Sequence, residues 1–313
     1  MKKTLAVVIA LMLAFSCASA MAMTLATGGE AGTYYAYGGV LATYINENTD
    51  LDITVVSSGG SQANIDLLDL GDAQLATVQN DVAKYAYYGE HDFEGAPVTS
   101  FTALAALYTE AVQIVTVDPE IKTVADLAGK TVSIGAPGSG VYYNAVEILE
   151  VYGLTEDDIN VQRQDFAGST EELKDGRIDA AFIVAGAPTT AIMDLDAAKS
   201  CYLVNLDDEH IAALQEINPT YARTIIPAGT YDHVDSDTLT VGMKATLVAN
   251  GDISEDEAYA IVSTIFDNTE AIADLHKKGD ELDLEYASVC GVPYHAGAAK
   301  YFAEHDIEVL TVD

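Results

Sequence analysis

Apolar and polar residues alternate along this chain in blocks that predict strands and helices in turn. An apolar run at 25–26 leads into a glycine-rich turn and then into a helical pattern that begins at about Thr33. Strands are predicted at 53–56 and 75–78, with a helical pattern between them. This β-α-β-α-β order is typical of a parallel sheet with helices on its faces.

The glycine-rich turn occurs a second time farther along the chain. Residues 32–35 (Gly-Thr-Tyr-Tyr) correspond to residues 140–143 (Gly-Val-Tyr-Tyr) at an offset of 108 residues, and Gly60-Ser61 corresponds to Gly168-Ser169 at the same offset. Solenoid repeats are far shorter, at about 20 to 50 residues. We therefore predict two similar α/β lobes, with strand ends and helix N-termini facing each other across a ligand cleft.

Two stretches are predicted to carry the chain between the lobes as hinge strands. The first consists of strands at 101–108 and 112–117, and the return is placed at 224–227. The predicted division is a leader at 1–22, a discontinuous lobe 1 at 23–112 and 227–313, and lobe 2 at 113–226. Ser-x-x-Glu patterns predict capped helices starting after Ser169 and Ser254.

The N-terminal segment has the three parts of a secretory signal. Two lysines precede an apolar run at 5–15, and the sequence Ala-Ser-Ala-Met-Ala follows at 18–22, where we expect cleavage after Ala20 or Ala22. Lipid attachment at Cys17 is an alternative, although residues 14–16 are a poor approach to a lipidated cysteine. We predict an exported, soluble, periplasmic and monomeric mature protein.

The composition limits the classes of partner. The chain has 49 acidic and 14 basic residues and a formal net charge of −35. Such a surface repels nucleic acid and anionic membranes, so neither is an expected partner. The capture of an anionic ligand must then depend on local N–H groups and hydroxyls.

The two cysteines outside the leader, Cys201 and Cys290, fall in different predicted lobes. A disulfide between them would restrict hinge motion, so we expect two free thiols. The six histidines have no metal-ligand spacing, and the chain lacks a Gly-x-Ser-x-Gly elbow, a P-loop ending and a dinucleotide-binding fingerprint. The sequence therefore predicts no catalytic residue, no metal site, no cofactor and no enzymatic activity.

Candidate ligand-binding residues lie in and after the two glycine-rich turns. We expect N–H groups around Ser139 and Gly140 to hold the ligand, with Thr33, Tyr35 and Gln79 opposite them. One tyrosine of each pair, 34–35 and 142–143, should face the cleft. The full set of predicted ligand-binding residues is Gly29, Thr33, Tyr34, Tyr35, Gly60, Ser61, Gln79, Tyr108, Ser139, Gly140, Val141, Gly168 and Gly186. Turn and capping roles are the alternative for each, and Ser61 in particular could serve only as an N-cap.

Motifs spread over nearly the whole chain after residue 22 resemble one family. They are Ala26 to Gly29, Gly32 to Tyr35, Gly60 and Ser61 with Asn64, Gly71 to Ala73, Val78 and Gln79, Ala106 to Glu110, Leu127 to Lys130, Gly135 to Gly140, Asp175 to Ala180, and Tyr294 to Ala298. Together they resemble the TRAP-associated extracytoplasmic immunogenic (TAXI) receptors of tripartite ATP-independent periplasmic (TRAP) transporters.

This resemblance implies a type II periplasmic-binding-protein fold that closes on a small organic acid such as glutamate or 2-oxoglutarate. The loaded receptor would then dock on membrane subunits driven by an ion gradient. The chain departs from the family at Val141, where a hydroxyl residue is common, and at Ala31, which is often glycine. Two alternatives remain on the same scaffold: a sensory subunit for a membrane kinase, and an enzyme with a nucleophile or cofactor lysine in the cleft.

Overall fold

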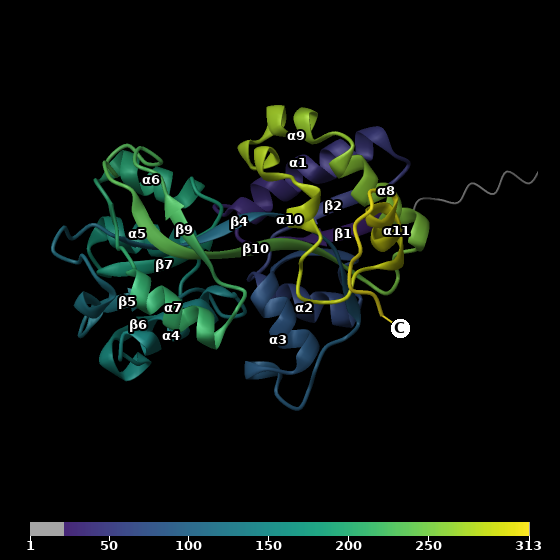
Figure 1. The fold of residues 1–313 in the computed structure, drawn as a ribbon. Helices are drawn as coiled ribbons and strands as arrows, with labels where there is room; N and C mark the ends of the chain where they lie inside the picture. The colour runs from purple at the N-terminus through teal and green to yellow at the C-terminus, as the bar shows by residue number, and fades with distance from the viewer. Residues whose placement is uncertain (1–21, 313) are drawn as a thin grey trace, which may run out of the picture.

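The computed structural model describes residues 22–312, which are organised around one ten-stranded sheet (Figure 1). Its strands lie in the order β2-β1-β3-β10-β4-β7-β5-β6, with β8 paired to β4 and β9 paired to β10. The strands are β1 Ala22–Ala26, β2 Asp52–Val56, β3 Leu75–Gln79, β4 Phe101–Thr116, β5 Thr131–Ser133, β6 Asn160–Gln162, β7 Ala180–Ala185, β8 Tyr202–Leu203, β9 Ala222–Ile226 and β10 Thr238–Asn250. The predicted leader lies outside the described residues except for Ala22, which begins β1.

Helices alternate with these strands and cover both faces of the sheet (Figure 1). The α-helices are α1 Thr33–Asn48, α2 Ser61–Leu70, α3 Asn80–Tyr88, α4 Val141–Val151, α5 Phe166–Asp175, α6 Thr190–Ala198, α7 Asp208–Ile217, α8 Glu255–Phe266, α9 Thr269–Leu275, α10 Leu284–Ala287 and α11 Ala296–Glu304. Short 3₁₀ turns lie at η1 His91–Phe93, η2 Val124–Leu127, η3 Glu156–Asp158 and η4 Lys277–Glu281. No helix within residues 22–312 combines the length and apolar character needed to cross a membrane.

Two halves of the molecule have separate apolar cores, which confirms the predicted two-lobed α/β architecture. One core surrounds β1, β2 and β3 and includes Leu25 and Leu75. Two other clusters lie in the second half, one around Ile114 and Val132 and one around Ile183. We call the halves lobe 1, which contains β1–β3 and the C-terminal helices, and lobe 2, which contains β5–β9.

The first crossing between the lobes is a single strand, whereas the sequence predicted two. β4 runs without a break through Thr109 and Glu110, because these residues pair with Lys244 and Met243 of β10. Its first half packs in the lobe 1 core and its second half in the lobe 2 cores. The polar dipeptide therefore marks a position inside the crossing strand and not a gap.

The return crossing lies in β10, later than the predicted position at 224–227. Those residues belong mostly to β9, which forms an antiparallel pair with the first residues of β10, Thr238 to Gly242. Tyr231 and Val234, between the two strands, pack in a lobe 2 core cluster. β10 then pairs with β3 through Ala245 to Ala249. We propose lobe limits near residues 110 and 243.

The predicted repeat is visible in the helix starts. α1 begins at Thr33 and α4 at Val141, which keeps the offset of 108 residues. The start predicted after Ser169 was wrong: α5 begins at Phe166, because the Asp165 side chain accepts the N–H of Gly168 and caps the helix earlier. The capping box predicted at Ser254 and Glu257 is present on α8.

Candidate functional site

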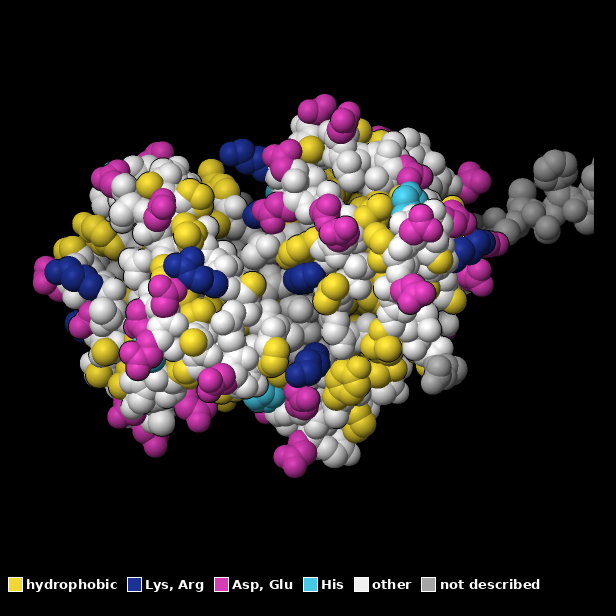
Figure 2. Space-filling model, viewed as in Figure 1, with side chains coloured by type: hydrophobic (Ala, Val, Ile, Leu, Met, Phe, Trp, Pro, Cys, Tyr) yellow, Lys and Arg dark blue, Asp and Glu magenta, His cyan; other side chains and the backbone are white. Residues whose placement is uncertain are grey.

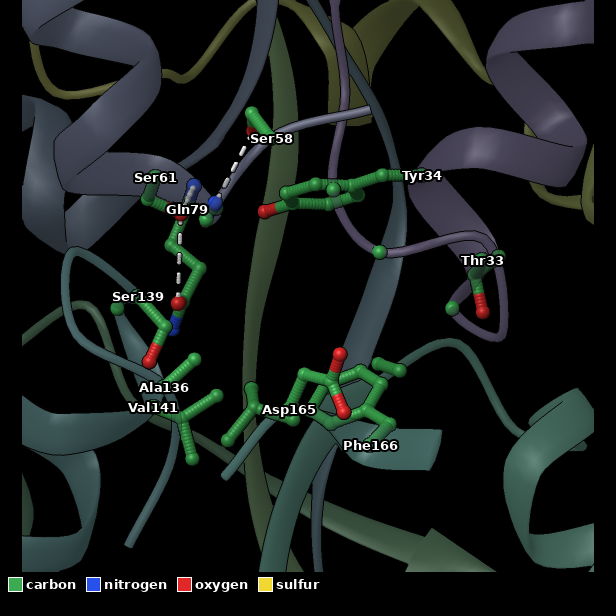
Figure 3. Close-up of a pocket in the computed structure, with 18 of the residues that line it drawn as sticks. Thr33, Tyr34, Ser58, Ser61, Gln79, Ala136, Ser139, Val141, Asp165 and Phe166 are labelled. Atoms are coloured by element: carbon green, nitrogen blue, oxygen red, sulfur yellow. Dashed lines mark hydrogen bonds between the residues drawn. The ribbon is translucent and has the colours of Figure 1, made fainter. Parts of the chain in front are cut away.

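A cavity of about 220 Å³ lies between the two lobes, at the carboxyl ends of the parallel strands (Figure 3). Its walls come from the loops after β1, β2, β5 and β6 and from the last residues of β3 and β7, which is where open α/β sheets bind ligands. The lining residues are Gly28, Gly29, Gly32, Thr33, Tyr34, Ser58, Gly59, Gly60, Ser61, Gln79, Glu110, Ala136, Ser139, Gly140, Val141, Asp165, Phe166, Val184 and Ala185.

Three helices present uncapped N-termini to this cavity. The N-cap residues of α1, α2 and α4 are Gly32, Gly60 and Gly140, and all three line the cavity. None carries a side chain that could accept the first-turn N–H groups, which have no partner within their own helices. Together with the positive ends of the helix dipoles, these groups favour an anion.

Ser139 adds a side-chain donor beside the N-terminus of α4. Its side chain is 93 % buried, and its Oγ has no hydrogen-bond partner among the described residues. The turn that holds it requires glycine at 135, where φ is +93° and a Cβ would lie 2.6 Å from Ser139 Oγ. A buried hydroxyl without a partner is costly, so this oxygen is free to bond a guest.

One buried acid lies at the floor of the cavity, on β4. Glu110 is 1 % exposed, and its Oε1 accepts a hydrogen bond of 2.5 Å from the Tyr34 hydroxyl. Burial raises the pKa of Glu110 well above its usual range, and the bond from Tyr34 opposes that shift only in part. Figure 3 shows the Tyr34 hydroxyl directed into the cavity.

The described residues that line the cavity include no lysine, arginine or histidine. All three arginines form ion pairs elsewhere, namely Arg163 with Glu156, Arg177 with Asp175 and Arg223 with Asp208. Figure 2 shows acidic side chains spread over both lobes of the face in view, with few basic ones among them. An anion in this cavity would therefore be held by N–H groups and hydroxyls, as expected from the composition.

The lobes are held together on one side of the cavity by the first residue of α1 and by the turn that precedes this helix. Thr33 Oγ1 donates to the carbonyl of Gly186 at 3.0 Å, and the N–H of Ala191 donates to the carbonyl of Ala31 at 3.2 Å. A side chain at Gly186 would meet Lys278 Cε at 2.5 Å, so glycine is needed for this close approach.

A second set of contacts joins the lobes on the opposite side of the cavity, where Figure 3 shows Gln79 beside Ser139. The N–H of Ala63 donates to the carbonyl of Gly138 at 3.0 Å. A Cβ at Gly140 would lie 1.8 Å from Gln79 Oε1. The two lobes are therefore in contact around the cavity, and the conformation is closed.

Next to these contacts lies a buried polar group that we call the interlobe cluster: Asp81, Tyr85, Asn144, Glu147 and Tyr221. Asn144 Nδ2 donates to Asp81 Oδ2 at 2.7 Å and to the Tyr221 hydroxyl at 2.9 Å. Glu147 accepts from Tyr85 at 2.7 Å and from Tyr221 at 2.5 Å. Burial, and then the nearby Glu147 charge, raise the pKa of Asp81 to about 7.

Nine of the thirteen predicted site residues line the cavity: Gly29, Thr33, Tyr34, Gly60, Ser61, Gln79, Ser139, Gly140 and Val141. Tyr35, Tyr108, Gly168 and Gly186 do not line it. Tyr108 is fully buried behind the cavity with its hydroxyl unpartnered among the described residues. Gly168 donates its N–H to Asp165.

One tyrosine of each pair was predicted to face the cleft, and the structure places a tyrosine on the cavity in the first pair only. Tyr34 faces the cavity while Tyr35 does not line it, but neither Tyr142 nor Tyr143 lines it. Tyr143 packs against the lobe 1 core and donates to Asp92, and the Tyr142 ring lies under the Arg163 guanidinium. The second pair therefore joins the lobes and stabilises the surface.

Several lining residues were missed, among them Ser58, Glu110, Ala136, Asp165 and Phe166. Glu110 offered a signal, because it is the one acid in a strand that is mostly buried and mostly apolar. Asp165 was hidden by the wrong start assigned to α5. Phe166 lies against Gly32 of the other lobe, a contact that no local pattern could reveal.

Comparison with known families decides the classification. Residues 25–305 match the NMT1-like family. The chain belongs to the NMT1-like family. The two predicted thiols of this NMT1-like protein, Cys201 and Cys290, are both free and buried, as expected.

Several solved structures are similar to this NMT1-like protein. An ancestral arginine-binding protein bound to glutamine is 12 % identical, with a TM-score of 0.54 over 83 % of this chain and 98 % of that one. A putative L-cystine ABC transporter from Listeria monocytogenes is 15 % identical, with a TM-score of 0.52 over 85 % and 98 %. A protein from Bordetella bronchiseptica RB50 is 18 % identical, with a TM-score of 0.53 over 90 % and 88 %. These likenesses show that the fold is that of periplasmic solute-binding proteins.

Proposed function

We propose that this protein is an extracytoplasmic receptor that captures a small organic acid and delivers it to membrane transport subunits. The observation that carries the proposal is the meeting of three uncapped helix N-termini and the unpartnered Ser139 hydroxyl in one cavity. Such a site binds a carboxylate through N–H donors without a basic side chain.

The size of the cavity supports a metabolite as the ligand. A volume of about 220 Å³ is below the roughly 300–1,000 Å³ typical of drug-sized ligand pockets. Residues of both lobes line the cavity, so one ligand can contact both lobes at once. Binding then favours the closed state to the extent that the ligand contacts both lobes.

The finer part of the proposal is delivery of glutamate, 2-oxoglutarate or a similar carboxylate to a TRAP transporter driven by an ion gradient. It is supported by the TAXI-like motifs at both glycine-rich turns, whose residues line the cavity. Location in the periplasm follows from the same proposal. Uptake of radiolabelled solute into vesicles containing the membrane subunits should require the receptor and an ion gradient, and should continue without ATP.

Binding can be tested with a thermal-shift screen of amino acids, oxo-acids, dicarboxylates and sugars, on protein that has been unfolded and refolded to remove carried-over ligand. A ligand at 100 times its Kd adds about 2.7 kcal/mol of stability. Ser139→Ala should weaken carboxylate binding about tenfold, because it removes one hydrogen bond to a charged group. Ser200→Ala, at an exposed serine outside the cavity, is the matched control. Binding of sugars alone would reject the proposal.

A further inference from the structure

Glu110 has hydrogen-bonding capacity that the protein does not use. Its Oε1 accepts the Tyr34 hydroxyl, whereas no hydrogen bond to Oε2 is formed by the described residues. The side chain is 1 % exposed and lines the cavity. A buried carboxyl group with one open oxygen on a ligand cavity calls for a donor on the ligand.

The second acid of the lining, Asp165, has a different role. Its side chain is exposed, and its Oδ1 accepts the N–H of Gly168 at 2.7 Å as the N-cap of α5. Asp165 is therefore solvated and occupied with capping the helix, whereas Glu110 is desolvated. A cation pairs far more strongly with a desolvated carboxylate than with a solvated one.

The cavity thus presents two opposite requirements. The N-termini of α1, α2 and α4 and the Ser139 hydroxyl favour a negative group, and Glu110 favours a positive one. A ligand with only carboxylates would place a negative charge near a buried acid that no basic side chain of the lining neutralises. A zwitterion satisfies both ends.

We propose that Glu110 binds a protonated amine of the ligand, so that the solute is an amino acid and not the matching oxo-acid. This inference rests on the proposed function and selects one chemical class within it. Tyr34 is the positioning residue, since its hydroxyl holds one carboxyl oxygen and leaves the other without a hydrogen bond among the described residues.

An ammonium group beside Glu110 favours the charged form of this acid, because an opposite charge nearby lowers the pKa of a carboxyl group. Burial and the nearby Asp81 raise the pKa of Glu110, whereas the Tyr34 hydrogen bond and the charge of Lys278 lower it. A carboxylate–ammonium pair then holds the amine of the ligand at Glu110. The other titratable groups that face Glu110 are the hydroxyls of Tyr108 and Tyr286.

The experiment is calorimetric titration with three matched pairs: L-glutamate and 2-oxoglutarate, L-alanine and pyruvate, and L-leucine and 4-methyl-2-oxopentanoate. In any pair that binds, we expect the amino acid to bind at least about 30-fold tighter, because the oxo-acid leaves a buried polar group unpaired. Titration in buffers of different ionisation enthalpy should show more protons released per amino acid bound than per oxo-acid bound, because only the ammonium group lowers the pKa of Glu110.

Variants test whether Glu110 is responsible for the preference for the amino acid over the oxo-acid. Glu110→Gln keeps an acceptor for Tyr34 but presents an amide, and should reduce the preference for the amino acid to below about threefold. Tyr34→Phe should reduce the preference by a smaller factor and provides the test if Glu110→Gln does not fold. Glu171→Gln, at an exposed residue of α5, is the matched control and should leave the preference unchanged.

The outcomes separate this inference from the proposed function. Equal affinity for both members of a binding pair, or loss of the preference in Asp165→Asn and not in Glu110→Gln, would overturn the role of Glu110 while the receptor function stands. Absence of binding by every carboxylate tested would overturn the receptor function itself.

Discussion

The interlobe cluster makes the stability of this protein depend on pH through Asp81. The closed structure raises the pKa of this carboxyl from 3.8 to about 7, chiefly through burial and then through the charge of Glu147. The native state therefore binds more protons than the unfolded state between about pH 4 and pH 7. Stability contributed by this group is greatest below pH 4, falls as the pH rises to 7, and is constant above that.

The size of the change in stability follows from the shift in the pKa of Asp81. About three pKa units at 1.36 kcal/mol each correspond to a loss of about 4 kcal/mol between pH 4 and pH 7. Asp81→Asn removes the titration and keeps an oxygen acceptor for one of the two donors to this side chain, Asn144 or the N–H of Val82. The variant should therefore gain stability relative to wild type as the pH rises, by up to about 4 kcal/mol over this range.

The assay is thermal or urea unfolding of ligand-free wild type and Asp81→Asn at half-unit steps from pH 4 to pH 8. A difference of 4 kcal/mol corresponds to roughly 8 °C in a protein of this size. The exposed variant Asp157→Asn controls for the general effect of removing one negative charge. Parallel curves for wild type and Asp81→Asn, with no change in their separation, would refute the reasoning.

Three further predictions follow from the contacts between the lobes and from one cap. Asn144→Ala removes one hydrogen-bond partner of Gln79 and one of Asp81 across the lobes, so calorimetry should show ligand affinity lowered by at least about tenfold. Unchanged affinity would contradict the role of Asn144 in closure. Gly140→Ala would place a Cβ against Gln79 and hold the lobes apart. Small-angle scattering with ligand should detect this as a larger radius of gyration. Gly39→Ala is the control, because a Cβ at that position would have no atom within 4 Å. Ser254→Ala breaks the capping box of α8 and should lower stability by about 1 kcal/mol without changing affinity, as measured by unfolding and titration.

Local patterns predicted much of the fold because each rests on chemistry within a few residues. The helix starts at Thr33 and Val141 followed from a glycine turn before an apolar period, and the cap at Ser254 from a spacing of three. The crossing strands were harder to place. Thr109 and Glu110 resemble a turn until β10 supplies their hydrogen-bond partners from more than 130 residues away.

The residues of the candidate site were likewise predictable where they belong to a local pattern, and not where they depend on contacts distant in sequence. Gly140 and Ser139 belong to a recognisable turn, so their place on the cavity was predictable. Glu110 and Phe166 reach the cavity only because the sheet and the second lobe fold around it, and their roles depend on contacts that are distant in sequence. Burial also decides which acid matters, and burial is a property of the assembled lobes.

The pairing of β4 with β10 has a mechanical consequence. Both passages between the lobes lie in neighbouring strands, which are about 4.8 Å apart in a sheet. The lobes are thus joined by only two neighbouring strands, and a two-stranded connection can twist as well as bend. Alignment of the closed lobes then depends on the bonds at each margin of the cavity, Thr33 to Gly186 on one and Ala63 to Gly138 on the other. Loss of either bond would let lobe 2 rotate about these two strands. The two walls of the cavity would then lose their alignment before the lobes separated.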